Sequence, residues 1–211
     1  MEDLVFLSGI GRNKKSYKGF FSLAPKNWNL HFLNSVFLMQ FGQDRAIEEI
    51  GIFLDKNNIV KANLVGHSLG GGLALLYASR YSKRVNHLFL LDSIGVNENK
   101  PLLNQVVDFF HARPIRKIVE DLKAIPTVVK HPILFSKLSS YVRRVDLQNE
   151  AENINVPTTI MWGEDDPLVS SSSGKKLSSI IKNSKFIVFS GVGHDWSLHN
   201  PELFWQNIKN G

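Results

Sequence analysis

Residues 64–72 read LVGHSLGGG and place one serine, Ser68, between glycines two positions away on either side. Serine is a favoured helix N-cap and glycines are common in loops, so one interpretation is a capped turn. The same letters match G-x-S-x-G, the sharp strand-to-helix turn that holds a nucleophilic serine above a sheet. An apolar run precedes Ser68 and a helical pattern follows it, which is the context that the second interpretation requires.

A serine nucleophile needs a base that takes its proton, an acid that orients the base, and amide donors for an oxyanion. WGEDDP contains Asp166 and GVGHDW contains His194, and each segment follows a predicted strand. Loops after parallel strands share one edge of a sheet, so both side chains can converge on Ser68. Taken alone, Asp166 would stabilise a turn and His194 would cap a helix or bind backbone. Together, in the order Ser, Asp, His, they predict a catalytic triad.

Short apolar runs alternate with helical patterns, which predicts an α/β fold with a mostly parallel six-stranded sheet flanked by helices. Alternating polarity in WNLHFLN favours the sheet edge for the second strand. Helices are predicted over residues 43–56, after Ser68, and over residues 196–209, and Gly70–Gly72 would let the helix after Ser68 approach the sheet closely. The predicted strands are residues 4–8, 29–33, 61–66, 86–91, 158–162 and 185–190.

A longer insertion separates the fourth and fifth strands. We predict that residues 1–94 and 157–211 form the core and that residues 95–156 form a helical lid. The lid would shape an apolar pocket lined by Phe109, Phe110 and Leu134. Its three helical patterns lie at residues 103–110, 115–122 and 134–142.

The composition is that of an ordinary globular domain, with 43% hydrophobic and 21% charged residues in 211. The net charge of +6 is spread along the chain, which favours a solvated basic surface over binding to nucleic acid or a membrane. Arg12, Lys14, Lys15 and Lys18 form one local excess. The first three could favour an anionic leaving group at the mouth of the site.

Several classes of chemistry are not expected. The chain has no cysteine, which excludes thiolate catalysis and disulfides, and no histidine pair has metal-ligand spacing. We therefore expect no metal and no cofactor. His67, next to Ser68, is expected to point away from the nucleophile. The N-terminal segment lacks the pattern of a signal peptide or membrane span, so a cytoplasmic location is expected.

GHSLGG, WGEDDP and GVGHDWSLHNPELF together resemble the α/β-hydrolase superfamily, in particular small lidded members related to carboxylesterases and carbon-carbon bond hydrolases. The resemblance implies Ser68 as nucleophile, His194 as base and then acid, and Asp166 as the residue that orients His194. Some members of the family use an acid after the preceding strand, so Asp92 is an alternative, with Asp165 as a further one.

The resemblance also implies an oxyanion hole built from the backbone amides of Ile10 and Leu69. Many relatives have His-Gly before the first donor, whereas this chain has Ser8-Gly9. Relatives also commonly have an antiparallel strand pair before the strand that leads to this loop, and the sequence here begins almost at that strand. Loss of the pair would leave WNLHFLN at the sheet edge, where a partner chain could cover it.

The leading hypothesis is a serine hydrolase that cleaves small or medium carboxylic esters through an acyl-enzyme. A thioesterase and a carbon-carbon bond hydrolase or lyase would use the same triad, and the sequence does not separate them. A non-catalytic binding or sensor protein on the same fold is the alternative of another class. The expected partner is a small ester or acyl substrate, and the sequence does not indicate an oligomeric state.

Overall fold

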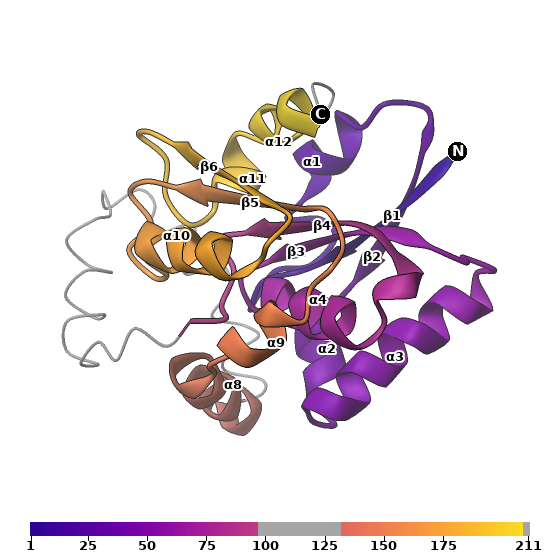
Figure 1. The fold of residues 1–211 in the computed structure, drawn as a ribbon, viewed down its shortest axis with the longest axis horizontal. Coiled ribbons are helices and arrows are strands. Elements are labelled where there is room, and N and C mark those ends of the chain that lie inside the picture. Colours follow the sequence, from indigo (N-terminus) through magenta and orange to yellow (C-terminus); the bar gives the residue numbers. More distant parts are fainter. Residues whose placement is uncertain (97–131, 209–211) are drawn as a thin grey trace.

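The predicted strands form one six-stranded sheet in the order β2-β1-β3-β4-β5-β6 (Figure 1). The computed structural model describes residues 1–96 and 132–208. Every neighbouring pair of these strands is parallel, so their carboxyl ends lie at one edge of the sheet. The expected fold class is therefore confirmed. The strands are β1 (Glu2–Leu7), β2 (Trp28–Leu33), β3 (Ala62–His67), β4 (Val85–Leu91), β5 (Thr158–Gly163) and β6 (Ser184–Phe189).

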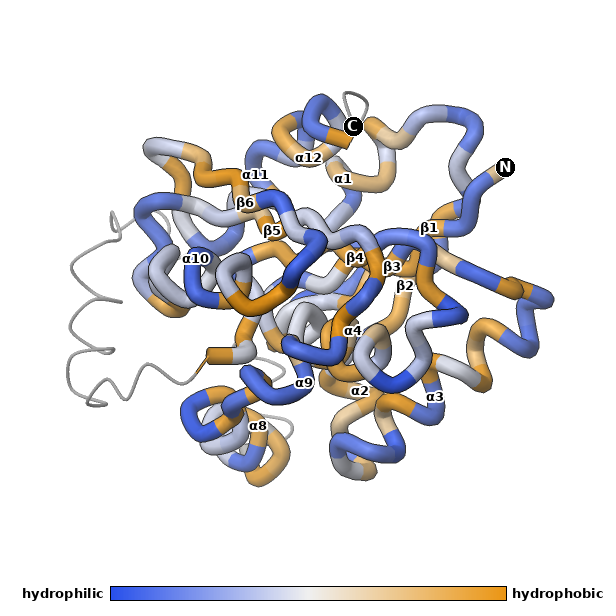
Figure 2. Tube along the Cα trace, viewed as in Figure 1, coloured by the Kyte–Doolittle hydropathy of each residue, from blue (hydrophilic) through white to orange (hydrophobic). Residues whose placement is uncertain are grey.

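Helices cover both faces of the sheet, because successive side chains of a strand point to opposite sides. Val5 and Leu7 of β1 belong to the larger core cluster, whereas Leu4 and Phe6 belong to the smaller one. Apolar segments accordingly line the interior on both sides (Figure 2). The larger cluster includes residues of α2 (Ser35–Met39), α3 (Gln43–Lys56), α4 (Leu69–Arg80), α8 (Pro132–Arg144), α9 (Gln148–Glu152) and α10 (Ser171–Ile180). The smaller cluster includes residues of α1 (Lys18–Ser22), α11 (Trp196–His199) and α12 (Glu202–Ile208).

The strand β2 lies at the sheet edge, as its mixed polarity predicted. All of its residues are partly exposed, in contrast to β3, which is buried throughout. His31 of β2 uses its Nε2 atom to contact the Asp3 carboxylate of β1 at 2.9 Å. A polar residue on this strand is therefore satisfied by its neighbour, while the outer edge of β2 pairs with no strand among residues 1–96 and 132–208.

The helix after Ser68 approaches the sheet as closely as its glycines predicted. A Cβ atom at Gly70 would collide with the carbonyl oxygen of Leu7, at the end of β1. At Gly72 it would lie 2.6 Å from Cγ1 of Ile94, which is inside any normal contact distance. These glycines allow α4 to begin directly over the carboxyl edge of the sheet, where the site lies.

The C-terminal helix was predicted as one element over residues 196–209, and this is wrong. The chain forms two helices there, α11 and α12, separated by Asn200 and Pro201. Proline disfavours helical geometry in the residue before it, and Asn200 has φ −130° and ψ 52°. The apolar spacing continues across the break because both helices pack on the same face of the sheet.

The end of the predicted insertion contains α8, which coincides with the third helical pattern, and α9. Leu138 of α8 is buried in the larger core cluster, and the amide of Leu147 donates to the carbonyl of Gly95 at 2.8 Å. The other two patterns, with Phe109 and Phe110, lie outside the described residues. The division into core and lid therefore stays a prediction. Between residues 1 and 96 and between 132 and 208, no helix is both long enough and apolar enough to cross a membrane.

Candidate active site

Ser68 stands in a tight turn between β3 and α4. Its backbone has φ 54° and ψ −117°, in a region that L-amino acids seldom adopt and that marks strained functional turns. The Ser68 amide donates to the carbonyl of Leu91 at the end of β4, at 2.9 Å. A side chain at Gly66 would place its Cβ 2.5 Å from Cα of Gly71. The sequence G-x-S-x-G thus folds here into the strand-turn-helix geometry that its nucleophilic interpretation requires.

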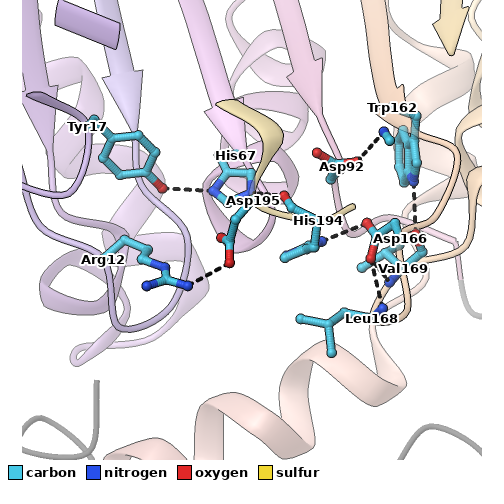
Figure 3. A network of polar contacts seen from close by, with 11 residues as sticks. Arg12, Tyr17, His67, Asp92, Trp162, Asp166, Leu168, Val169, His194 and Asp195 are labelled. Carbon is cyan, nitrogen blue, oxygen red and sulfur yellow. Dashed lines mark hydrogen bonds and ion pairs between the residues drawn. The ribbon is translucent and has the colours of Figure 1, made fainter. Parts of the chain in front are cut away.

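Asp166 and His194 form a buried pair at the same edge of the sheet (Figure 3). Nδ1 of His194 lies 2.7 Å from Oδ2 of Asp166. The other carboxylate oxygen, Oδ1, accepts hydrogen bonds from the amides of Leu168 and Val169 at 2.8 and 3.0 Å. Asp166 therefore stabilises its own turn and orients the histidine at once. Because an ionised carboxylate only accepts, Nδ1 carries the hydrogen, which leaves Nε2 as the basic nitrogen.

His194 lies next to the turn that contains Ser68. The rings of His194 and His67 have their centroids 5.0 Å apart, and His67 directly precedes Ser68. The structure thus brings the ends of β3, β5 and β6 together as the sequence predicted. The complete triad of Ser68, Asp166 and His194 remains a prediction.

Asp92, the alternative acid, lies at the end of β4 and is fully buried. Its Oδ1 accepts from the Gly163 amide at 2.9 Å, whereas its Oδ2 has no hydrogen-bond partner among the described residues. Burial, followed by the charge of Asp166, raises the pKa of the Asp92 carboxyl well above its ordinary value. Burial and the neighbouring carboxylate thus favour the neutral form of Asp92, and Asp166 is the residue that accepts the hydrogen bond from Nδ1 of His194.

The same three residues have the types of a metal site. Asp92, Asp166 and His194 each offer one ligand atom, and these atoms lie within 4.8 Å of one another. The oxygen atoms of Asp166 accept from one imidazole and two amides, so its charge is already compensated. The arrangement can serve proton transfer without a further cation.

The loop after β1 passes beside Ser68, where the family resemblance places one side of the oxyanion hole. A Cβ atom at Gly9 would lie 3.4 Å from Cβ of Ser68. The Gly9 amide donates to the Tyr17 hydroxyl at 3.0 Å and is therefore already engaged. On the other side, Leu69 is the first residue of α4, and the first amides of a helix have no acceptor within it. The pair of amides from Ile10 and Leu69 stays a prediction that this arrangement permits.

His67 does not simply turn away from the site, contrary to expectation. Its buried ring lies between Tyr17 and the backbone of His194, with Nδ1 at 2.7 Å from the Tyr17 hydroxyl and Nε2 at 2.9 Å from the His194 carbonyl oxygen. No local pattern in the sequence indicates these contacts, because Tyr17 is separated from His67 by 50 residues. Only the position of His67 next to Ser68 suggested any nearness to the chemistry.

Arg12, which was expected at the mouth of the site, forms an ion pair there. Its Nη2 lies 2.6 Å from Oδ2 of Asp195, and both side chains are mostly buried. Lys14 lies with its Nζ 5.7 Å from the centroid of the Phe21 ring. Because Asp195 neutralises the charge of Arg12, this residue is a weaker candidate for binding an anionic leaving group.

A surface pocket of about 210 Å³ borders the loop after β1. Leu134, which was predicted to line a substrate pocket, lines this pocket together with polar groups, and its use by a substrate stays a prediction. The pocket is therefore mixed in character rather than apolar. Its lining includes Arg12, Asn34, Val36, Phe37, Gln40 and Leu134.

Comparison with known proteins agrees with this fold. A model of the α/β-hydrolase fold family matches residues 20–114. Lipase 3 of Moraxella sp. (strain TA144) is 22% identical over 92% of this chain and 71% of its own length. The structure of a bacterial membrane phospholipase A superposes with a TM-score of 0.81 at 20% identity, covering 99% of this chain and 77% of the other. The family model, the relatives and the shared fold together support a member of the α/β-hydrolase superfamily.

Other members of the α/β-hydrolase superfamily that match this chain carry names from a different reaction class. The 2-hydroxy-6-oxononadienedioate/2-hydroxy-6-oxononatrienedioate hydrolase of Pseudomonas sp. is 23% identical over 74% of this chain and 65% of its own length. The relatives thus support a hydrolase, while their names span more than one substrate class.

Proposed function

We propose that this α/β-hydrolase is a serine hydrolase that cleaves small or medium carboxylic esters through an acyl-enzyme. One observation carries the proposal: the buried 2.7 Å contact between His194 Nδ1 and Asp166 Oδ2, next to the strained turn of Ser68. A base fixed by a carboxylate beside a serine in this conformation is the arrangement needed to activate the hydroxyl. The expected cytoplasmic location and small-molecule partner belong to the same proposal.

The reaction would begin when Ser68 Oγ attacks the ester carbonyl carbon while His194 Nε2 takes the hydroxyl proton. The carbonyl electrons move to oxygen, and the amides of Ile10 and Leu69 donate to the resulting oxyanion. Asp166 remains ionised and holds the Nδ1–H of the imidazolium. When the intermediate collapses, the bond to the alkoxy oxygen breaks and His194 gives its proton to the departing alcohol. An acyl group then stays on Ser68.

Water completes the cycle. His194 Nε2 takes a proton from a water molecule as its oxygen attacks the acyl carbon, and a second oxyanion forms in the same hole. Collapse breaks the bond to Ser68 Oγ, the histidine returns its proton to that oxygen, and the carboxylic acid leaves. The mixed pocket beside the loop after β1 offers both apolar surface and polar groups to a substrate.

A carbon-carbon bond hydrolase is the second candidate, and the Pseudomonas relative favours it because that protein's name specifies a hydrolase of a hydroxy-oxo dienedioate. A thioesterase would use the same side chains. A purely non-catalytic sensor is disfavoured, since it has no need of a buried pair that leaves the imidazole basic at Nε2.

Active-site labelling tests the proposal. A fluorophosphonate should label the wild-type protein and fail to label Ser68→Ala. Failure of the folded wild type to label would contradict the hydrolase proposal, and labelling of Ser68→Ala would assign the nucleophile elsewhere. A panel of p-nitrophenyl esters, acyl-thioesters and a vinylogous 1,5-diketone then separates the three substrate classes by kcat/KM.

A further inference from the structure

A buried chain of hydrogen bonds connects the loop after β1 with the loop that contains His194 (Figure 3). The Gly9 amide donates to the Tyr17 hydroxyl at 3.0 Å, and this hydroxyl lies 2.7 Å from Nδ1 of His67. Nε2 of His67 lies 2.9 Å from the carbonyl oxygen of His194. Tyr17 and His67 are both at least 99% buried, so water does not compete for these groups.

The hydrogen-bonding roles in this chain have a single consistent assignment. The carbonyl oxygen of His194 can only accept, so Nε2 of His67 carries a hydrogen. The Tyr17 oxygen accepts from the Gly9 amide, and its own hydrogen points to Nδ1 of a neutral His67. Burial lowers the pKa of His67 to about 4, and burial raises that of Tyr17. Both side chains therefore stay neutral at physiological pH, and each hydrogen bond in the series keeps the same donor and acceptor.

An ion pair between Arg12 and Asp195 joins the same two loops. Arg12 follows Gly9 in the loop after β1, and Asp195 follows His194 directly. Their side chains meet at 2.6 Å with 19% and 12% of their surface exposed. The loop expected to supply an oxyanion donor is thus tied twice to the loop that supplies the base.

We propose that Tyr17 and His67 are positioning residues that fix the His194 backbone relative to the loop after β1, so that base and oxyanion donor keep one geometry. The proposal rests on the proposed serine hydrolase function. Asp166 holds the imidazole of His194 from one side, and His67 holds its main chain from another. Neither Tyr17 nor His67 needs to contact substrate.

The expected cost follows from geometry. A misplacement of catalytic groups by about 1 Å can lower the rate by about a hundredfold without affecting binding to the same extent. Tyr17→Phe leaves the Gly9 amide and His67 Nδ1 without their partner. It should lower kcat by about tenfold to a hundredfold, with KM changed by less than about threefold.

Two substitutions of His67 distinguish the hydrogen bond at its Nε2 atom from the one at its Nδ1 atom. The longer side chain in His67→Gln extends an amide N–H to the place of Nε2 and can keep the bond to the His194 carbonyl. The shorter one in His67→Asn reaches only the place of Nδ1 and loses that bond. We expect His67→Asn to reduce kcat as Tyr17→Phe does, and His67→Gln to recover most of the loss.

Matched controls come from two residues outside this set of hydrogen bonds, the buried Tyr77 and the partly buried His87. Tyr77→Phe removes a hydroxyl from α4, and His87→Asn changes a histidine that contacts Thr159 at 2.9 Å. Both should leave kcat unchanged. Near-ultraviolet circular dichroism establishes that every variant is folded.

Proton NMR of the downfield Nδ1–H of His194 reports its position independently of turnover. We expect this signal to shift or broaden in Tyr17→Phe and His67→Asn and to persist in His67→Gln and the controls. An active wild type whose kcat and NMR signal are unchanged by Tyr17→Phe and His67→Asn would overturn the positioning role. A wild type that hydrolyses nothing and yet shows the NMR changes would refute the proposed function and leave the positioning role in place.

Discussion

Replacing Asp166 by asparagine should abolish almost all activity, for a reason that the hydrogen bonds of this carboxylate make specific. Its Oδ1 accepts from the amides of Leu168 and Val169, and its Oδ2 faces Nδ1 of His194. In Asp166→Asn the carboxamide oxygen must stay opposite the two amide donors. The NH₂ group is then forced toward His194.

An NH₂ group can only donate, so Nδ1 of His194 would become the acceptor and its hydrogen would move to Nε2. That tautomer has no lone pair available to take the serine proton. The corresponding substitution in a known triad lowers kcat by about 10⁴-fold, which equals about 5.4 kcal/mol of transition-state stabilisation. We expect a loss of this order here, with little change in KM because the side chain does not face substrate.

Steady-state hydrolysis of a p-nitrophenyl ester measures the effect, with Asp92→Asn as the matched control. Asp92 is buried at the same edge and its raised pKa favours the neutral acid, so an uncharged isostere should keep activity within about tenfold of the wild type. The reasoning is refuted if Asp166→Asn stays within tenfold of the wild type. It is equally refuted if the 10⁴-fold loss is found in Asp92→Asn instead.

Three further outcomes follow. Because the pKa of Asp92 is raised in the folded state, the folded protein binds the Asp92 proton more tightly than the unfolded chain does, and the unfolding free energy should fall as pH rises above about 4. In urea unfolding at pH 5 and pH 8, Asp92→Asn should show a smaller decrease than the wild type. An equal decrease in both proteins would contradict this prediction. Arg12→Met removes the ion pair between Arg12 and Asp195 and should lower the unfolding free energy by about 1 to 3 kcal/mol. Arg12→Lys should restore part of this loss. Equal urea midpoints for the wild type and Arg12→Met would show that the ion pair does not stabilise the fold. Gly70→Ala forces a Cβ atom against the Leu7 carbonyl and should destabilise the fold by about 3 kcal/mol in thermal unfolding. Gly191→Ala should cost less despite the positive φ of Gly191, because a Cβ atom there meets nothing within 4 Å.

The sheet and the loops of the candidate site could be predicted because their signals are local. Each strand is a short apolar run, and the residues proposed for the triad follow three of these runs within a few positions. Once parallel pairing is assumed, convergence of Ser68, Asp166 and His194 follows from topology alone. The edge position of β2 was equally readable, because alternating polarity reports how fully a strand is covered.

Contacts between distant segments could not be predicted in this way. Tyr17 lies in a stretch dominated by lysines, and nothing local distinguishes it from an exposed tyrosine. It is buried because the loop after β1 folds over His67, which is a tertiary effect. The helix break at Pro201 was not predicted for a different reason. The sequence contains the proline, but the apolar periodicity continues on both sides of it and suggested one continuous helix.

The sequence alone does not decide which of two aspartates holds His194, and the local hydrogen bonds do. Asp92 and Asp166 both follow strands at the same edge, so topology admits either one. Asp166 is surrounded by three donors, whereas Asp92 has one amide donor and a buried oxygen without a partner among the described residues. Donors stabilise a carboxylate and burial favours the neutral acid, so the surroundings of Asp166 suit an acceptor for His194 and burial raises the pKa of Asp92. A neutral Asp92 adds no charge beside His194, whereas a second negative charge would stabilise the imidazolium and reduce the fraction of the imidazole that is free to take a proton.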